Sequence, residues 1–124
     1  MDISEIAPQA RAFDILHPGN GEPIGLKVTL LPMTDEKVES ARRKIQNRRL
    51  SSRSTKVTAD QLDTEGLELL CASVGGWEWV GEATFKGEQP ECTPENVRRV
   101  LKEAKWIKDQ IDREAGYTEA FFEA

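Results

Sequence analysis

Alternating apolar and polar residues near the start of the chain predict a pair of β-strands. Residues 12–16 form the first strand candidate, and residues 25–31 place alternate leucine and valine side chains on one face. The intervening residues 17–23 are rich in glycine and proline, which favour turns. We therefore expect an N-terminal β-hairpin whose loop is longer than the tightest class.

Helical spacing of apolar residues begins after this hairpin. Thr34 is a suitable N-cap for a first helix, because acidic residues follow it where the helix dipole favours anions. The apolar stripe of this helix is thin and consists of Val38, Ala41 and Ile45. The other faces are rich in basic residues, and residues 51–57 are predicted to form the loop that follows.

Two later segments carry stronger helix signals. Thr58 and Gln61 form a capping box, in which each side chain can satisfy a backbone donor at the helix start. The stripe that follows has i, i+3, i+4, i+7 spacing and consists of Leu67, Leu70, Cys71 and Val74. The last helical pattern begins at Thr93-Pro94 and predicts one long or kinked helix that runs to Gly116.

Two short extended segments lie between these helices. The Gly75-Gly76 pair is expected to end the second helix. Residues 77–80 and 83–85 then flank a Gly-Glu turn signal, and a second short hairpin is one way to pair them.

The chain as a whole fits one domain. Its 124 residues can enclose one core but not two. We expect a single α+β domain over residues 1–124 that is mostly helical, with three to four helices and the N-terminal hairpin. Residues 1–9 are expected to form a loose, flexible start, and residues 117–124 either a last helical turn or a flexible tail.

Composition and charge limit the location and the partners of the chain. No apolar run approaches the ~20 residues that span a bilayer, and the start lacks a signal peptide pattern. Two cysteines without metal-ligand spacing favour a reducing cytoplasm. The net charge of −5 argues against general attraction to nucleic acid. A basic segment at residues 34–56 precedes an acidic one at 57–96, which suits self-association, a charged partner, or two surfaces that cancel within one molecule.

No group of residues forms a convincing catalytic or metal site. His17 is the only histidine, and its place beside a proline in a turn favours a plain turn residue. Cys71 lies on an apolar helix face, where a thiol acts as a small hydrophobe. Cys92 has acidic neighbours, which would raise the pKa of its thiol. We expect no enzymatic activity and no cofactor, with a small hydrolase that uses Cys92 or a carboxylate as the remaining enzymatic alternative.

The basic helix carries the main alternative function. Arg42, Arg48 and Arg49 belong to a cluster that extends to Arg53 and could contact phosphate in a small nucleic-acid-binding regulator. The cluster lacks interleaved aromatic residues and any known reading motif. A solvated face or a protein-docking face explains such a charge run better.

Aromatic residues near the end of the chain are the first candidates for partner binding. Two adjacent rings, Phe121 and Phe122, cannot both face one core from a helix, which leaves two alternatives: at least one ring is exposed, or the chain end docks so that both pack against the domain. Together with Tyr117, they would provide the kind of exposed aromatic that anchors protein contacts. The three tryptophans, which are Trp77, Trp79 and Trp106, are expected mostly in the core.

Three segments together resemble the tail assembly chaperone family of long-tailed bacteriophages. Residues 13–26 are similar to the opening of that family, in which a strand, the motif P-x-x-G-E-P-x-G and a second strand follow one another. Residues 69–77 are similar to a helix end that runs into Gly-Trp. Residues 93–101 and 106–111 are similar to an E-N-V helix followed by a W-I-x-x-Q-I helix. A proline often precedes the family's second Trp, whereas Lys105 stands here, which leaves a break between the last two helices open.

The resemblance implies a function and its partners. Such proteins bind the long tape measure protein before the tail tube forms, keep it soluble and help recruit tail tube protein. They act in the host cytoplasm and are absent from the mature virion. Many are also made in a longer form by ribosomal frameshifting, and this chain would then be the short form.

Overall fold

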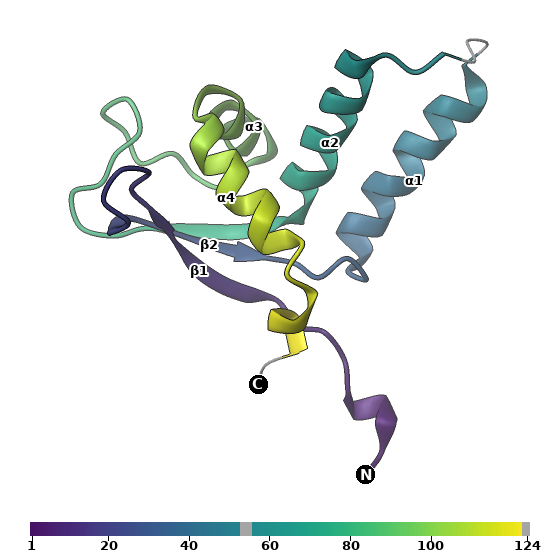
Figure 1. Cartoon of the computed structure of the whole chain (residues 1–124), viewed down its shortest axis with the longest axis horizontal. Coiled ribbons are helices and arrows are strands. Elements are labelled where there is room, and N and C mark those ends of the chain that lie inside the picture. The colour runs from purple at the N-terminus through teal and green to yellow at the C-terminus, as the bar shows by residue number, and fades with distance from the viewer. Residues whose placement is uncertain (53–55, 123–124) are drawn as a thin grey trace.

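The computed structural model describes residues 1–52 and 56–122. In these residues, four α-helices and a three-stranded antiparallel sheet form a mostly helical α+β fold, which confirms the predicted fold class (Figure 1). In chain order, the elements are η1 (Ile3–Glu5), β1 (Arg11–Leu16), β2 (Pro23–Leu30), α1 (Glu36–Ser51), α2 (Ala59–Ser73), β3 (Val74–Trp79), α3 (Pro94–Glu103), α4 (Lys105–Ala115) and η2 (Thr118–Phe122), where η denotes a 3-10 helix. Of the loop predicted at 51–57, residues 53–55 lie outside the described residues, and Ser51 is still helical.

The predicted N-terminal hairpin is confirmed, but the second hairpin is not formed. β1 pairs with β2 in antiparallel fashion, and β3 pairs with the other edge of β2. Residues 77–80 therefore do not pair with 83–85, and Phe85 instead makes an isolated bridge with Glu88. The physical reason is that β2 offers buried partners, since Val28 lies opposite Trp77 in the register.

The helix starts follow the capping signals with two corrections. The N-cap of α1 is Asp35, whose side chain accepts a bond from the backbone N–H of Lys37, and not Thr34. Thr58 caps α2 as predicted, and its hydroxyl oxygen accepts from the N–H of Gln61 at 3.1 Å. No reciprocal bond from the Thr58 N–H to the Gln61 side-chain oxygen is found among the described residues, and the Gln61 amide N–H donates to Glu65.

The second helix ends earlier than its glycines suggest. α2 stops at Ser73, and Gly75 and Gly76 belong to β3. A Cβ atom at Gly75 would lie 2.7 Å from Leu31 Cδ2, so glycine allows the close approach of these two segments. The glycine pair therefore serves strand packing, while the helix ends at Val74 in an extended conformation.

The last helical stripe is divided into two helices. α3 ends at Glu103 and α4 begins at Lys105, with the buried Ala104 between them at φ −109° and ψ 79°. The break occurs without proline at position 105. It turns the chain so that Ile107 and Ile111 face the core that α3 has already entered.

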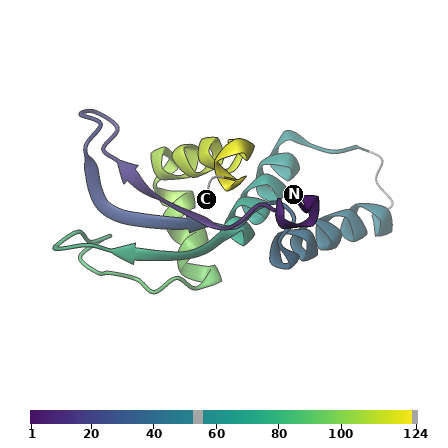
Figure 2. The same cartoon turned by 90° about the horizontal axis from the view of Figure 1, so that it is seen from below.

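One face of the sheet carries the core. α3 and α4 cover that face, as the two views show (Figure 1, Figure 2). The buried cluster joins residues of all three strands with residues of α2, α3, α4 and η2, for example Ile15, Leu26, Val74, Leu101 and Ile111. The helix α1 contributes no residue to this cluster. Its two buried residues, Val38 and Ile45, lie outside it.

The C-terminal segment docks on the start of β1. Arg11 forms an ion pair with Glu114, and its guanidinium lies 5.4 to 6.0 Å from the ring centres of Phe13, Tyr117 and Phe121. In addition, the carbonyl oxygen of Phe121 accepts a bond from the backbone N–H of residue 9 at 2.8 Å. Residues 118–122 thus form a docked 3-10 turn, and residues 123–124 lie outside the described residues.

Candidate functional site

A groove of about 520 Å³ opens between α1, the end of α2 and the start of α3. We call it the three-helix groove. Helix α1 lines it with one stripe at i, i+3, i+4, i+7 spacing, which consists of Lys37, Ser40, Ala41 and Lys44. The α2 wall and the turn into β3 repeat this spacing with Glu68, Cys71, Ala72 and Gly75. The third wall includes Thr93, Pro94, Val97 and Arg98 at the start of α3.

Small residues keep this groove open. The middle of the α1 stripe is Ser40 and Ala41, and the facing α2 stripe has Cys71 and Ala72. None of these side chains is long enough to fill the space between two helices. The result is a concave surface with a partly apolar floor and charged residues at its margins, which is the usual form of a binding site.

Both cysteines lie in the three-helix groove. Burial raises the pKa of the Cys71 thiol, and the nearby Arg98 and Lys37 lower it by smaller amounts. Burial also raises the pKa of the Cys92 thiol. The predicted direction for Cys92 is therefore right, but its cause is burial and not the acidic neighbours. A raised pKa disfavours the thiolate, which is the nucleophilic form, and the single histidine of the chain, His17, lies outside the groove.

His17 occupies a turn, as predicted. Its Nδ1 accepts bonds from the backbone N–H groups of Gly19 at 2.9 Å and Asn20 at 3.2 Å. The side chain is exposed and stabilises the loop between β1 and β2. Across residues 1–52 and 56–122, no three His, Cys, Asp or Glu side chains gather closely enough to hold a metal ion.

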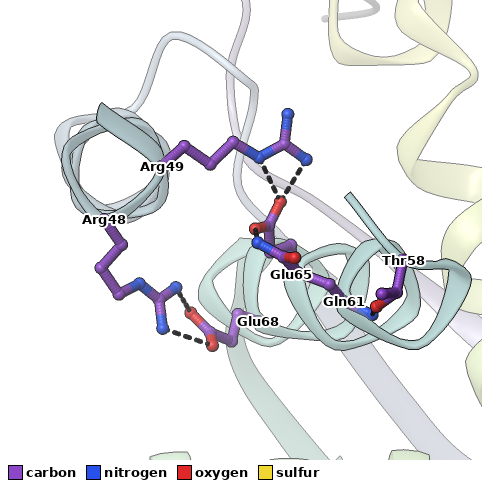
Figure 3. A network of polar contacts seen from close by, with 6 residues as sticks. All are labelled: Arg48, Arg49, Thr58, Gln61, Glu65 and Glu68. Carbon is purple, nitrogen blue, oxygen red and sulfur yellow. Dashed lines mark hydrogen bonds and ion pairs between the residues drawn. The ribbon is translucent and has the colours of Figure 1, made fainter. Parts of the chain in front are cut away.

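The predicted basic residues on α1 are largely paired within the chain (Figure 3). Arg48 donates to both carboxylate oxygens of Glu68 at 2.5 and 3.1 Å. Arg49 donates through Nε to Glu65 at 2.9 Å and through a second nitrogen to the same oxygen. These bonds raise the pKa of each arginine and lower the pKa of Glu65. The basic and acidic segments of the sequence therefore cancel in part within one molecule.

The remaining basic candidates differ from this pair. Arg42 is half-buried on α1 and has no ion pair among the described residues. Arg53, at the end of the predicted cluster, lies outside those residues. Of the three arginines predicted to bind a partner, Arg42 alone has no carboxylate partner in the part of the chain that the structure describes.

The aromatic candidates separate into buried and exposed residues. Phe121 is 5% exposed and belongs to the core, whereas Phe122 and Tyr117 are 48% and 51% exposed. Of the two alternatives for the Phe121-Phe122 pair, the structure has the one with an exposed ring, which is Phe122. The expected core position of Trp106 is wrong, because it is 37% exposed while its neighbour Ile107 points inward. Trp77 and Trp79 are half-buried, and both indole N–H groups donate to the carbonyl oxygen of Pro90.

Comparison with models of protein families, with curated proteins and with solved structures finds no match to this chain. Within the described residues, no helix combines the length and the apolar character that crossing a membrane requires.

Sequence reasoning did not find the three-helix groove. Ala41 and Cys71 fall on apolar helix stripes, a pattern that indicates packing and does not indicate a binding surface. A usable signal was present, since small residues occupy the middle of two stripes at helical spacing with lysine at both ends of one of them. That signal shows where the side chains on a helix surface are short, but it does not show which neighbouring element leaves the space above them unfilled.

Proposed function

We propose that this chain is a tail assembly chaperone of a long-tailed bacteriophage. In this role it binds the tape measure protein, keeps it soluble and helps recruit tail tube subunits in the host cytoplasm. It would act by surface contact, with no bond-making chemistry, and would leave before the virion is mature.

The contact between the first and third resembling segments carries the proposal. Gln110, from the W-I-x-x-Q-I segment, donates to the carbonyl oxygen of Leu16 at 2.7 Å and accepts from its N–H at 2.8 Å. Leu16 belongs to the opening hairpin, 94 positions away. The first and third segments that carry the resemblance therefore lie against each other in one folded unit. The separation of α3 from α4 also agrees with the family's pair of helices, although Lys105 replaces the usual proline.

The surface suits a protein that holds other proteins. Phe122 and Tyr117 present exposed rings near the C-terminal end. Three further exposed apolar residues lie where α1 ends and α2 begins, and they are Leu50, Val57 and Leu62. Shielding apolar area provides roughly 25 cal/mol per Å² before association costs. A net charge of −5 would help to keep such a complex soluble.

The ion pairs count against the nucleic-acid-binding alternative. Arg48 and Arg49 already donate to carboxylates of α2, so phosphate would have to displace Glu68 and Glu65. The alternative predicts binding of DNA or RNA at low salt that weakens when Arg42, Arg48 and Arg49 are made neutral. A gel-shift measurement without any shift removes it.

Co-expression with the tape measure protein of the same phage is the direct experiment. We expect a larger soluble fraction of the tape measure protein with this chain than with an unrelated acidic protein of similar size. Copurification of the two proteins should accompany the gain. Equal solubility with this chain and with the unrelated protein would refute the proposed function.

A further inference from the structure

The shape of the three-helix groove fits a row of side chains from another helix. Its volume of about 520 Å³ lies within the usual range for binding pockets, roughly 300–1,000 Å³. Its two long walls are α1 and the end of α2, where most backbone groups are bonded within the helix, so an extended peptide finds few main-chain partners along them. A helix, in contrast, satisfies its own backbone and needs only a hollow for its side chains.

The charged residues at the groove margins differ in whether they have an ion-pair partner. Glu68 is neutralised by Arg48 from outside the groove, which leaves Glu95 as the carboxylate without an ion pair among the described lining residues. Lys44 and Arg98 are exposed and likewise have no ion pair within the described residues. The Lys37 ammonium donates to the carbonyl oxygen of Val74 at 3.2 Å and has no ion pair among residues 1–52 and 56–122. The groove therefore presents a surplus of positive charge around a partly apolar floor.

We propose that the three-helix groove binds an amphipathic helix of a partner protein whose apolar stripe is flanked by acidic side chains. The apolar stripe would lie over Ala41, Ala72 and Val97, and the acidic side chains would reach Lys44 and Arg98. None of the described residues that line the groove is aromatic, so none can stack on a base, which favours a protein partner over nucleic acid. This inference rests on the proposed function in one respect, since a segment of the tape measure protein would then be the occupant.

Two synthetic helical peptides test the proposal on the full chain. Both carry the same fluorescent label and apolar stripe, and the flanking residues are glutamate in one and lysine in the other. We expect fluorescence anisotropy to show that the glutamate peptide binds, that added salt weakens it, and that the lysine peptide binds at least roughly tenfold more weakly. Equal binding of both peptides, or binding of neither, overturns the proposal.

Two groups of variants locate the binding. The double variant Lys44→Glu/Arg98→Glu should bind the glutamate peptide with an affinity that is lower by roughly tenfold or more. The matched control Lys102→Glu/Lys105→Glu changes the net charge equally at exposed residues outside the groove and should bind like the unchanged protein. Ala72→Leu should also weaken binding, because it fills the floor. Far-UV circular dichroism checks that each variant is folded, and binding that survives both groove variants overturns the proposal.

Other occupants give different results. Competition by a single-stranded oligonucleotide for the glutamate peptide would overturn the proposal in favour of nucleic acid. A dimer in sedimentation that dissociates in Lys44→Glu/Arg98→Glu but not in the control would overturn it in favour of a second copy of this chain.

The co-expression experiment separates this inference from the proposed function. If both the unchanged protein and the groove variant keep the tape measure protein soluble, the groove inference fails and the proposed function stands. If the unchanged protein does not keep the tape measure protein soluble but binds the glutamate peptide through the groove, the proposed function fails and the groove inference stands.

Discussion

Helices α1 and α3 belong to the same domain but are held in it by different forces. α3 buries Val97, Val100 and Leu101 to 1% exposure or less in the central cluster. α1 buries only Val38 and Ile45, both outside that cluster, and its outer half is joined to α2 by ion pairs at the surface. Surface ion pairs contribute little to stability, whereas buried apolar groups contribute much. The comparison indicates that α3 is part of the core, while α1 is an added wall that creates the three-helix groove.

The largest effect is expected from truncating the core helix. Leu101→Ala should reduce the free energy of unfolding by about 2–5 kcal/mol, because it removes packing and leaves a cavity at a fully buried site. Ile45→Ala, on α1, should cost less, since this residue is 9% exposed and its surroundings can relax. Urea denaturation followed by circular dichroism measures both. A cost for Ile45→Ala equal to that for Leu101→Ala would show that α1 is as firmly packed as α3.

A smaller effect is expected from charged contacts, and it should depend on burial. Arg11→Gln should reduce the free energy of unfolding by about 1–3 kcal/mol, because hydrogen bonds to charged groups in partly buried sites contribute that much. The variant also lacks the contacts that the Arg11 guanidinium makes with three aromatic rings. Arg43→Gln, which breaks the exposed pair with Glu36, should change it by less than about 0.5 kcal/mol. Similar losses in the two variants would contradict the distinction.

The smallest effect concerns pH and the attachment of α1. The hydrogen bond from Arg49 holds the pKa of Glu65 below its ordinary value of 4.5. Because the folded-state pKa is the lower one, this contact stabilises the fold above pH 4.5 and is lost as the pH falls through the folded-state pKa. Glu65→Gln should therefore flatten the acid limb of stability slightly, and high salt should do the same. Glu82→Gln, at an exposed residue, serves as the control, and an equal flattening there would exclude the Arg49–Glu65 contact as the cause.

Elements whose signals are local could be predicted from the order of residues alone. The hairpin followed from alternation and turn residues, and the starts of α2 and α3 followed from Thr58 and Thr93, because a capping hydroxyl acts on backbone N–H groups two or three residues away. The apolar stripe of α3 also identified its buried face, since periodicity fixes which side chains share a side. The turn role of His17 was local in the same sense.

Features that depend on distant partners could not be predicted from local patterns and became visible in the folded chain. β3 joined β2 instead of forming a second hairpin, because pairing depends on which strand edge is free and buried nearby. Arg48 and Arg49 form ion pairs with two glutamates of α2. Phe121 is buried with the Arg11 guanidinium over its ring, and no local pattern in the sequence encodes either contact. The three-helix groove arose in the same way, because a stripe of small residues becomes a hollow only where two other helices stop short of filling it.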